Sequence, residues 1–377
     1  MDVRALNTYI VQPGDTIYSI ARNHGLTTEQ LLSTNPGIMG RELVLGETIQ
    51  LPPLTQGRQS IEVNGYVYPN ADEAYLNKVL PYLTYLSIIG NRITSSGNLI
   101  GVNNREMIET ARRANVAPVM VVSNTTENGL YFSGLAHAVL TSSAARDTLI
   151  TDIVEDVQAN NYYGALIDFE FVAPDYFPAY ANFLQMLKSA LNAQNYKLFI
   201  VIRIIVIFSE QAALAQSLPL AEGLTDRFFI RTNEWACNVN LEASVLELTQ
   251  QAMGFLTQLI PKWKIIIGIP NCCFAVPLPY EPNMQPAQLS VAESERLAAQ
   301  AGVNFQIDSS TGTMYFQYIN DMGTETVVWC PNRSVNQSIL ELVRIYGLGG
   351  VSYRMIEDFP ITDYQTLSII FDIQKVI

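Results

Sequence analysis

Charged residues and histidine are both scarce in this sequence. Only 15% of the 377 residues are charged, whereas 49% are hydrophobic, which is ample for a sizeable core. The chain has two histidines and neither is close to a cysteine, so a zinc site is not expected. The sequence predicts no metal ion and no cofactor.

Cysteine is scarce as well. The four cysteines are Cys237, Cys272, Cys273 and Cys330, too few and too clustered for the disulfide framework of a small secreted protein. A bridge between the neighbours Cys272 and Cys273 would be strained. The sequence therefore predicts free thiols in the core.

The chain also lacks a basic surface and a long apolar run. Its net charge of −13 argues against nucleic acid and against an anionic membrane surface as partners, and favours a neutral or zwitterionic glycan. No run of about 18 apolar residues occurs, because Arg203 interrupts the longest one, residues 198–208. Residues 1–5 lack the basic start and apolar segment of a secretory signal. We expect synthesis in the cytoplasm, without membrane insertion or a classical signal peptide.

What the sequence does contain is an apolar run, residues 164–171, in which Asp168 and Glu170 stand two residues apart. Side chains alternate along a strand, so both carboxylates point to the same side, about 6 to 7 Å apart. The run is typical of a buried parallel strand, and a β/α barrel carries its chemistry at the C-terminal ends of such strands. The alternative is a pair of carboxylates satisfied by arginines or backbone donors.

Seven similar runs alternate with helical patterns, in the rhythm of repeated βα units. The eight candidate strands are residues 61–67, 82–89, 117–122, 165–171, 197–202, 227–231, 265–269 and 350–353. We therefore predict an α/β fold, a (β/α)8 TIM barrel over residues 61–377. The long gap between strands 7 and 8 contains alternating stretches around residues 321–323 that predict a hairpin.

Residues 1–54 are predicted to form a separate βααβ module, followed by a linker at 55–60. The expected elements are a strand at 9–11, two short helices and a closing strand at 47–51, with Thr27 as the cap of the second helix. The motifs Val-x-Pro-Gly-Asp-Thr, Ile-Ala, Asn-Pro and Leu-x-x-Gly-x-x-Ile-x-Leu-Pro resemble a LysM repeat. This resemblance implies binding of N-acetylglucosamine-containing glycans, by Gly14, Asp15, Thr16, Ile17, Asn35, Pro36, Gly37 and Ile38. Capping and turn formation are the alternative roles of these residues.

The motif Gly-x-x-Ile-Asp-Phe-Glu resembles the fourth-strand signature of glycoside hydrolase family 18, and the whole chain resembles the LysM-containing N-acetylglucosaminidases of the bacterial spore cortex. The resemblance implies substrate-assisted cleavage, with Glu170 as the acid and Asp168 orienting the 2-acetamido group. It also implies an α+β lobe, residues 279–334, inserted between strands 7 and 8. The implied partner is peptidoglycan or a chitin-like glycan, and the implied location is the spore envelope (coat or cortex) or the cell wall. Self-assembly and envelope protein partners stay open.

Several positions depart from that family's pattern. Tyr163 and Leu166 replace acidic residues before Asp168, and residues 272–276 replace an aromatic motif after strand 7. On strand 6 a Met-x-Tyr-Asp/Glu motif is present as Arg231, Thr232, Asn233 and Glu234, and on strand 8 a tryptophan is replaced by Arg354. The expected substrate contacts in the barrel are Asn124, Asn233, Glu234 and Arg354. A turn or loop-capping role is the alternative for Asn124.

Two functions therefore stay open. One is a glycosidase that cleaves N-acetylglucosamine linkages, and the other is a catalytically impaired relative that binds glycan or has a structural role in the envelope. Arginine side chains paired with Glu170 would favour the second, because ion pairing favours the ionised form of a group that must donate a proton. An open cleft would favour the first.

Overall fold

The computed structural model describes residues 7–24, 26, 28–38, 41, 43–51, 58–203, 211–232, 245–279, 286–308 and 313–377. The chain forms two compact units, Met1–Gln59 with Ile369–Asp372 and Ser60–Ser368 with Ile373–Ile377. Within the described ranges, no helix combines the length and the hydropathy needed to cross a membrane.

The first unit has the predicted βααβ order. Its elements are β1 (Asn7–Ile10), α1 (Ile17–Asn23), α2 (Thr28–Thr34), a 3-10 turn (Pro36–Ile38) and β2 (Thr48–Leu51). The two strands pair antiparallel, with Asn7 opposite Leu51. Apolar side chains from every element fill the core, among them Val11, Ile20, Leu31, Ile38 and Ile49. The predicted cap Thr27 lies outside the described residues.

The second unit is a closed barrel of eight parallel strands, as predicted. The strands are β3 (Ser60–Val67), β4 (Tyr85–Ile93), β6 (Ala117–Ser123), β7 (Gly164–Asp168), β8 (Lys197–Arg203), β9 (Arg227–Arg231), β10 (Ile265–Ile269) and β16 (Gly350–Tyr353). They follow one another around the barrel, and β16 and β4 both pair with β3, which closes it. The apolar runs of the sequence form these strands because their side chains are buried on both faces.

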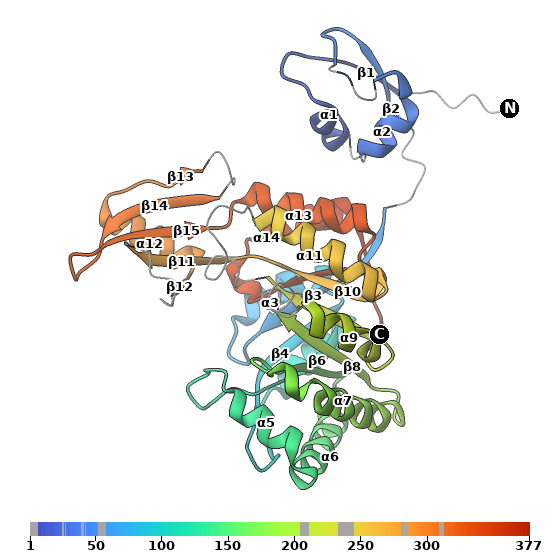
Figure 1. The fold of residues 1–377 in the computed structure, drawn as a ribbon, viewed down its shortest axis with the longest axis vertical. Helices are drawn as coiled ribbons and strands as arrows, with labels where there is room; N and C mark the ends of the chain where they lie inside the picture. Colours follow the sequence, from blue (N-terminus) through green and yellow to red (C-terminus); the bar gives the residue numbers. More distant parts are fainter. Residues whose placement is uncertain are drawn as a thin grey trace, which may run out of the picture. The chain divides into compact units, whose positions relative to one another are not determined.

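Helices connect consecutive barrel strands (Figure 1). The described ones are α3 (Glu73–Val79), α4 (Arg105–Arg113), α5 (Ser133–Thr141), α6 (Ser143–Ala159), α7 (Phe177–Asn192), α9 (Gln211–Glu222), α11 (Val245–Leu259), α13 (Arg333–Tyr346) and α14 (Ile361–Ile370). Two short strands, β5 (Leu99–Ile100) and β17 (Asp372–Ile373), extend the barrel sheet at β4 and β3. Buried side chains such as Tyr85, Leu166, Phe199 and Phe229 fill the barrel interior, so it is a packed core.

The segment between β10 and β16 forms an α+β lobe on one side of the barrel (Figure 1). Its strands are β11 (Cys272–Pro277), β12 (Ala287–Ser290), β13 (Gln306–Ile307), β14 (Met314–Ile319) and β15 (Glu325–Cys330), with α12 (Val291–Ala301). They pair in the order β12-β11-β15-β14-β13. The lobe's sheet thus begins at Cys272, ahead of the expected boundary at residue 279, because β11 leaves the barrel and pairs with β15.

The expectation of free thiols is wrong for two of the four cysteines. Cys273 on β11 and Cys330 on β15 form a disulfide, with their Cα atoms 4.2 Å apart. Both side chains are fully buried in the lobe core, where the Ser294 hydroxyl contacts the two sulfur atoms. The pairing could not be predicted from the sequence, because the two cysteines are 57 residues apart and only the antiparallel pairing of β11 with β15 brings them together. Cys272 is not part of this disulfide, and Cys237 lies outside the described residues.

Candidate active site

Five charged side chains meet at the C-terminal rim of the barrel. Asp168 ends β7, with Glu170 two residues further on, Arg203 ends β8, Arg231 ends β9, and Arg354 follows the last residue of β16. Because the strands are parallel, their C-terminal ends lie at the same rim, which brings these distant residues together.

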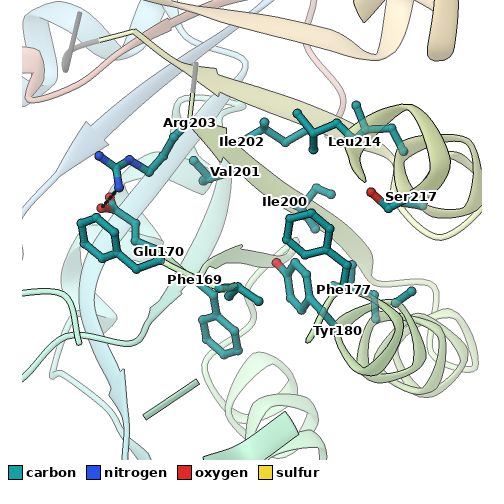
Figure 2. Close-up of a pocket in the computed structure, with 16 residues that line it drawn as sticks. Phe169, Glu170, Phe177, Tyr180, Ile200, Val201, Ile202, Arg203, Leu214 and Ser217 are labelled. Atoms are coloured by element: carbon teal, nitrogen blue, oxygen red, sulfur yellow. Dashed lines mark ion pairs between the residues drawn. The ribbon is translucent and has the colours of Figure 1, made fainter. Parts of the chain in front are cut away.

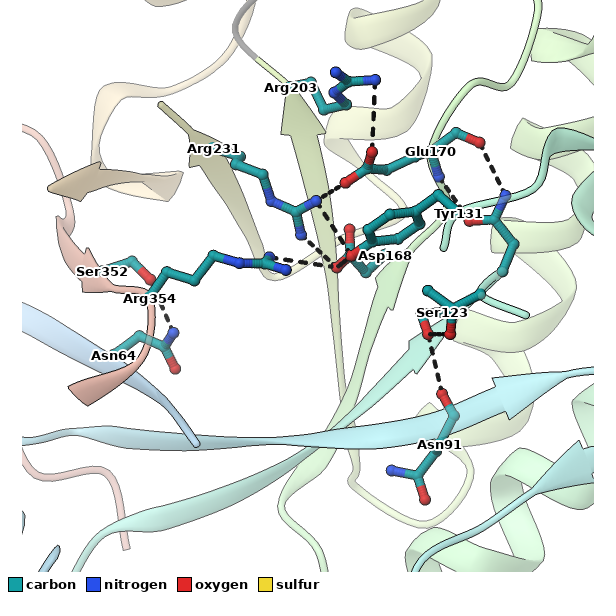
Figure 3. Close-up of polar contacts among 12 residues, drawn as sticks. Asn64, Asn91, Ser123, Tyr131, Asp168, Glu170, Arg203, Arg231, Ser352 and Arg354 are labelled. Carbon is teal, nitrogen blue, oxygen red and sulfur yellow. Dashed lines mark hydrogen bonds and ion pairs between the residues drawn. The ribbon is translucent and has the colours of Figure 1, made fainter. Parts of the chain in front are cut away.

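Arg231 lies between the two acids (Figure 3). One guanidinium nitrogen donates to an oxygen of Glu170 and the other to Oδ2 of Asp168. All three side chains are buried, with exposed fractions of 3 to 6%. A buried cation that bonds two carboxylates compensates charges that would otherwise be costly to bury.

Two further arginines face the same acids. Arg203 lies 3.5 Å from Oε2 of Glu170, and its guanidinium carbon is 4.4 Å from the ring centre of Phe171. Arg354 approaches Oδ2 of Asp168 at 3.9 Å, beyond hydrogen-bonding distance. Each acid is therefore attracted by two guanidinium groups.

Asp168 has a second donor in Tyr131, which lies in the loop between β6 and α5. The Tyr131 hydroxyl donates to Oδ2 of Asp168 at 2.7 Å, and it accepts from Arg231 at 3.3 Å. Burial alone would raise the pKa of Asp168, but the charges of Arg231 and Arg354 and the two hydrogen bonds hold that pKa below its ordinary value. Its other oxygen, Oδ1, is buried and has no hydrogen-bond partner among the described residues.

Asn124 positions the backbone of Glu170. Its side-chain nitrogen donates to the carbonyl oxygens of Glu170, at 2.9 Å, and Phe132, at 3.1 Å. Its side-chain oxygen accepts from the Glu170 N–H at 2.8 Å. Backbone groups therefore occupy both ends of the Asn124 amide, which is a loop-capping role, and its role as a substrate contact stays a prediction.

Tyr163 and Leu166, which stand where the family motif has acidic residues, pack against apolar side chains. Leu166 is fully buried in the barrel core. Tyr163 precedes β7 and packs against Tyr85 and Phe199, with ring centres 6.0 and 6.5 Å away. Polar support for Asp168 comes from Tyr131 and the arginines instead of from the strand that carries it.

A mostly apolar cavity of about 140 Å³ lies beside Glu170 (Figure 2). Its walls come from the end of β7, from β8 and from helices α7 and α9, with Glu170 and Arg203 as its charged lining. The Tyr180 hydroxyl is buried and has no hydrogen-bond partner in the described ranges. The cavity lies among the segment after β7, strand β8 and helices α7 and α9, and it reaches the acid site at Glu170 and Arg203.

Most of the predicted glycan-binding residues of the first unit have structural contacts of their own. Asp15 accepts from the Tyr9 hydroxyl and the Gln12 N–H, both at 2.7 Å. Thr16 caps α1, because its hydroxyl oxygen accepts from the Ser19 N–H at 2.9 Å. Ile17 is half-buried against the core of the unit, whereas Gly14 is exposed with a φ of 85°.

The predicted glycan-binding residues 35–38 also have structural contacts within the unit. The Asn35 amide donates to the carbonyls of Leu31 and Gln50, at 2.8 and 2.7 Å, and accepts from the Gln50 N–H at 2.8 Å. It thereby fixes the end of α2 to β2. Ile38 is buried in the core, while Pro36 and Gly37 are exposed. The two loops share one apolar core through Ile17 and Ile38.

Two predicted contacts in the barrel, Asn233 and Glu234, lie outside the described residues. Of the described site residues, sequence reasoning missed Tyr131, because it belongs to a loop that no strand or helix pattern marks. In the described parts of the chain, no group of three or more histidine, cysteine, aspartate or glutamate side chains could hold a metal ion.

Comparison with known proteins adds independent findings. Residues 9–52 match the LysM domain family. The cortical fragment-lytic enzyme of Bacillus anthracis is 26% identical over 91% of this chain and 93% of its own. The crystal structure of the Bacillus cereus spore cortex-lytic enzyme SleL aligns with a TM-score of 0.77, at 22% identity over 99% of this chain and 88% of SleL.

A second solved structure connects the barrel to a wider group. A glycoside hydrolase family 18 N-acetylglucosaminidase from Paenibacillus barengoltzii aligns with a TM-score of 0.64, at 17% identity, over 81% of this chain and 99% of its own. At that identity the likeness concerns the fold. The chain thus consists of a LysM domain and a TIM barrel of the glycoside hydrolase family 18 fold, and it is homologous nearly end to end to the cortical fragment-lytic enzymes.

Proposed function

We propose that this protein binds N-acetylglucosamine-containing glycan of the spore envelope or cell wall, and that its barrel has lost most or all of the hydrolytic activity of its relatives. The observation that carries the proposal is the contact of Arg231 with both Asp168 and Glu170. Its glycan-directed part is supported by the LysM match and by the relatives, which are named as cortex-lytic enzymes.

The chemistry that Arg231 would block is the substrate-assisted route implied by the family 18 motif. In that route the 2-acetamido oxygen of the sugar attacks the anomeric carbon, and a carboxylic acid must give a proton to the departing oxygen. Glu170 is the residue at the acid's position. Its carboxyl group accepts a charge-assisted hydrogen bond from Arg231 and lies 3.5 Å from Arg203, so both of its oxygens face cations where an acid would have to carry a proton.

The carboxylate of Asp168 is also occupied by hydrogen bonds from the protein. Asp168 would have to orient the acetamido group, yet its Oδ2 accepts from both Arg231 and Tyr131. The guanidinium group of Arg231 also occupies space between the two acids, where a sugar ring would have to enter (Figure 3). Arg354 further replaces the aromatic surface on which a sugar would stack.

A working glycosidase is the second candidate, and one observation favours it. Asp168 and Glu170 keep the strand-end spacing of the family motif, and Oδ1 of Asp168 is an acceptor without a partner in the described ranges, as an acetamido N–H would require. In that case the arginines would have to move away when substrate enters.

For the LysM domain we propose glycan binding at the loops that contain Gly14 and Gly37. Both glycines are exposed, and the shared apolar core under the loops holds them in a fixed arrangement. Exposed backbone groups there could bond an acetamido group, while half-buried Ile17 offers an apolar contact for its methyl.

The test measures binding and hydrolysis on the same samples. Full-length protein is incubated with purified cortex peptidoglycan and with chitin, then sedimented, and the released reducing ends are counted. The proposal predicts that the protein sediments with peptidoglycan while reducing ends stay at the level of the Glu170→Gln variant. Release that Glu170→Gln abolishes would establish the glycosidase, and loss of sedimentation would remove the binding function.

A further inference from the structure

Helices α7 and α9 leave a space over strand β8, which is the cavity of about 140 Å³ described above. Protein interiors are packed as densely as organic crystals, and voids larger than a water molecule are few. Several side chains that line this space keep a small exposed fraction, 8% for Ile202, 5% for Leu214 and 8% for Ala221. Part of each is therefore accessible to a small molecule.

The sequence of α9 gives a local reason for this space. Pro219 lies inside the helix, where it cannot donate to the carbonyl oxygen of residue 215 and its ring disfavours a straight helix. Its neighbour Leu218 lines the cavity. A helix interrupted in this way does not follow the neighbouring strand closely along its whole length.

The lining suits an apolar molecule of limited size. Most of it is aliphatic or aromatic, with Leu184, Ile200 and Leu214 among its members. An apolar cavity of about 150 Å³ holds one benzene molecule. The cavity between α7 and α9 therefore has the size of a single aromatic ring.

Two hydroxyl groups face the cavity from different helices, Tyr180 from α7 and Ser217 from α9 (Figure 2). The Tyr180 hydroxyl is buried without a hydrogen-bond partner in the described ranges, and its ring packs against Phe169 and Phe183, with ring centres 6.0 and 6.3 Å away. Burial raises the pKa of Tyr180, so its hydroxyl keeps its proton and can donate. The Ser217 hydroxyl donates to the Ala213 carbonyl at 2.8 Å, which leaves its oxygen able to accept.

The charged end of the cavity favours a neutral ligand. Glu170 and Arg203 belong to the lining, and a guanidinium nitrogen of Arg203 lies 3.5 Å from Oε2 of Glu170. An anionic ligand would be repelled by the carboxylate and a cationic one by the guanidinium group. Since a buried hydroxyl without a partner is costly, a ligand oxygen that pairs with Tyr180 is stabilised.

We infer that this cavity is a binding site for a small neutral phenol. The ring lies among the aliphatic side chains, and the phenol oxygen accepts from Tyr180 while its proton is available to Ser217. An aromatic hydrocarbon of the same size has the ring and lacks the hydroxyl, and a benzoate adds a charge. The site is separate from the proposed glycan-binding loops, and the inference does not depend on the proposed function.

The test is titration calorimetry of the full chain with phenol, toluene and benzoate. Wild type is expected to bind phenol about three- to tenfold more tightly than toluene, as a net hydrogen bond allows, and to bind benzoate most weakly. Tyr180→Phe keeps the ring and should lose most of the preference for phenol, without loss of thermal stability, because the hydroxyl that it removes has no partner. Tyr68→Phe, at an exposed tyrosine outside the cavity, should keep the preference.

A further variant tests the location of the site. Ala221→Phe adds a ring to the lining of the cavity and should abolish the binding of both phenol and toluene. No measurable binding of phenol by wild type, equal affinities for phenol and toluene, or tighter binding of benzoate than of phenol would each overturn the inference. A preference of wild-type size in Tyr180→Phe, or phenol binding that survives in folded Ala221→Phe, would overturn it as well.

Discussion

The guanidinium group of Arg231 binds Asp168 and Glu170 at once, so a single buried cation bonds one oxygen of each carboxylate. This contact decides how the rim is interpreted. Two acids at the mouth of a barrel suggest catalysis, whereas two acids that share an arginine form a buried ion network.

Replacement of Arg231 should destabilise the protein at neutral pH. Arg231→Met leaves two buried carboxylates short of a cation, which costs about 3 to 5 kcal/mol of unfolding free energy. The matched control, Arg296→Met on the exposed face of α12, should cost almost nothing. Urea denaturation at pH 7 measures both, and equal stabilities would mean that the Arg231 contact contributes little.

The loss of stability caused by Arg231→Met should depend on pH. In wild type the pKa of Asp168 is held below its ordinary value, so its contribution to stability is complete above about pH 4 and is lost as the pH falls through the lowered value. Without Arg231, the largest influence on Asp168 is burial, which raises its pKa and makes protonation stabilising. The stability gap between wild type and Arg231→Met should therefore shrink from pH 7 to pH 4. A gap that widens over that range would contradict the assignment.

Asn124 should matter for stability and for the position of Glu170. Asn124→Ala removes three hydrogen bonds to backbone groups, two of them buried, and the unpaired groups left behind should cost roughly 1 to 3 kcal/mol. Asn192→Ala, at an exposed position in α7, is the control and should be close to neutral. Thermal denaturation distinguishes the two, and a neutral Asn124→Ala would show that the backbone at Glu170 does not depend on this amide.

The disulfide in the lobe should stabilise the fold and should be detectable as a covalent link. Cys330→Ser should lower the unfolding free energy by about 2 to 4 kcal/mol, because the bridge closes a loop of 57 residues. Cys272→Ser, next in sequence to the bridge but outside it, should have little effect. Peptide mapping without reductant should recover Cys273 linked to Cys330. Recovery of both as alkylated free thiols would disprove the pairing.

The LysM loops can be tested without damage to the domain core. A Cβ at Gly37 would meet no atom of the described residues within 4 Å, so Gly37→Trp should fold normally while its indole covers the proposed glycan-binding loop. We expect loss of sedimentation with peptidoglycan. Gly223→Trp in the barrel also meets open space and should bind like wild type. Unchanged binding by Gly37→Trp would exclude this loop.

The sequence predicts the fold well because apolar runs and helical periodicity are local signals. All eight barrel strands and the βααβ order of the first unit correspond to such patterns. The sequence leaves open whether arginines pair with the acids, and it places Arg231 and Arg354 at the ends of strands. The C-terminal ends of parallel barrel strands lie at the same rim, so residues at those ends lie close to one another in the site.

Features that depend on distant contacts could not be predicted in the same way. Tyr131 reaches Asp168 from a loop, and Cys273 meets Cys330 only after β11 pairs with β15. Asn124 was expected to contact substrate, because an amide at a strand end fits either role. Only the structure shows that backbone groups occupy both ends of it.

The most direct test of the account is hydrolysis of a fluorogenic N-acetylglucosamine oligomer and of cortex fragments by three proteins. These are wild type, Glu170→Gln, and a variant that combines Arg231→Met, Asn233→Tyr and Arg354→Trp to restore the family pattern. The account predicts equal background rates for wild type and Glu170→Gln, and a higher rate for the combined variant that a further Glu170→Gln change abolishes. Wild-type turnover that disappears in Glu170→Gln would contradict it and would establish Glu170 as a working acid despite Arg231.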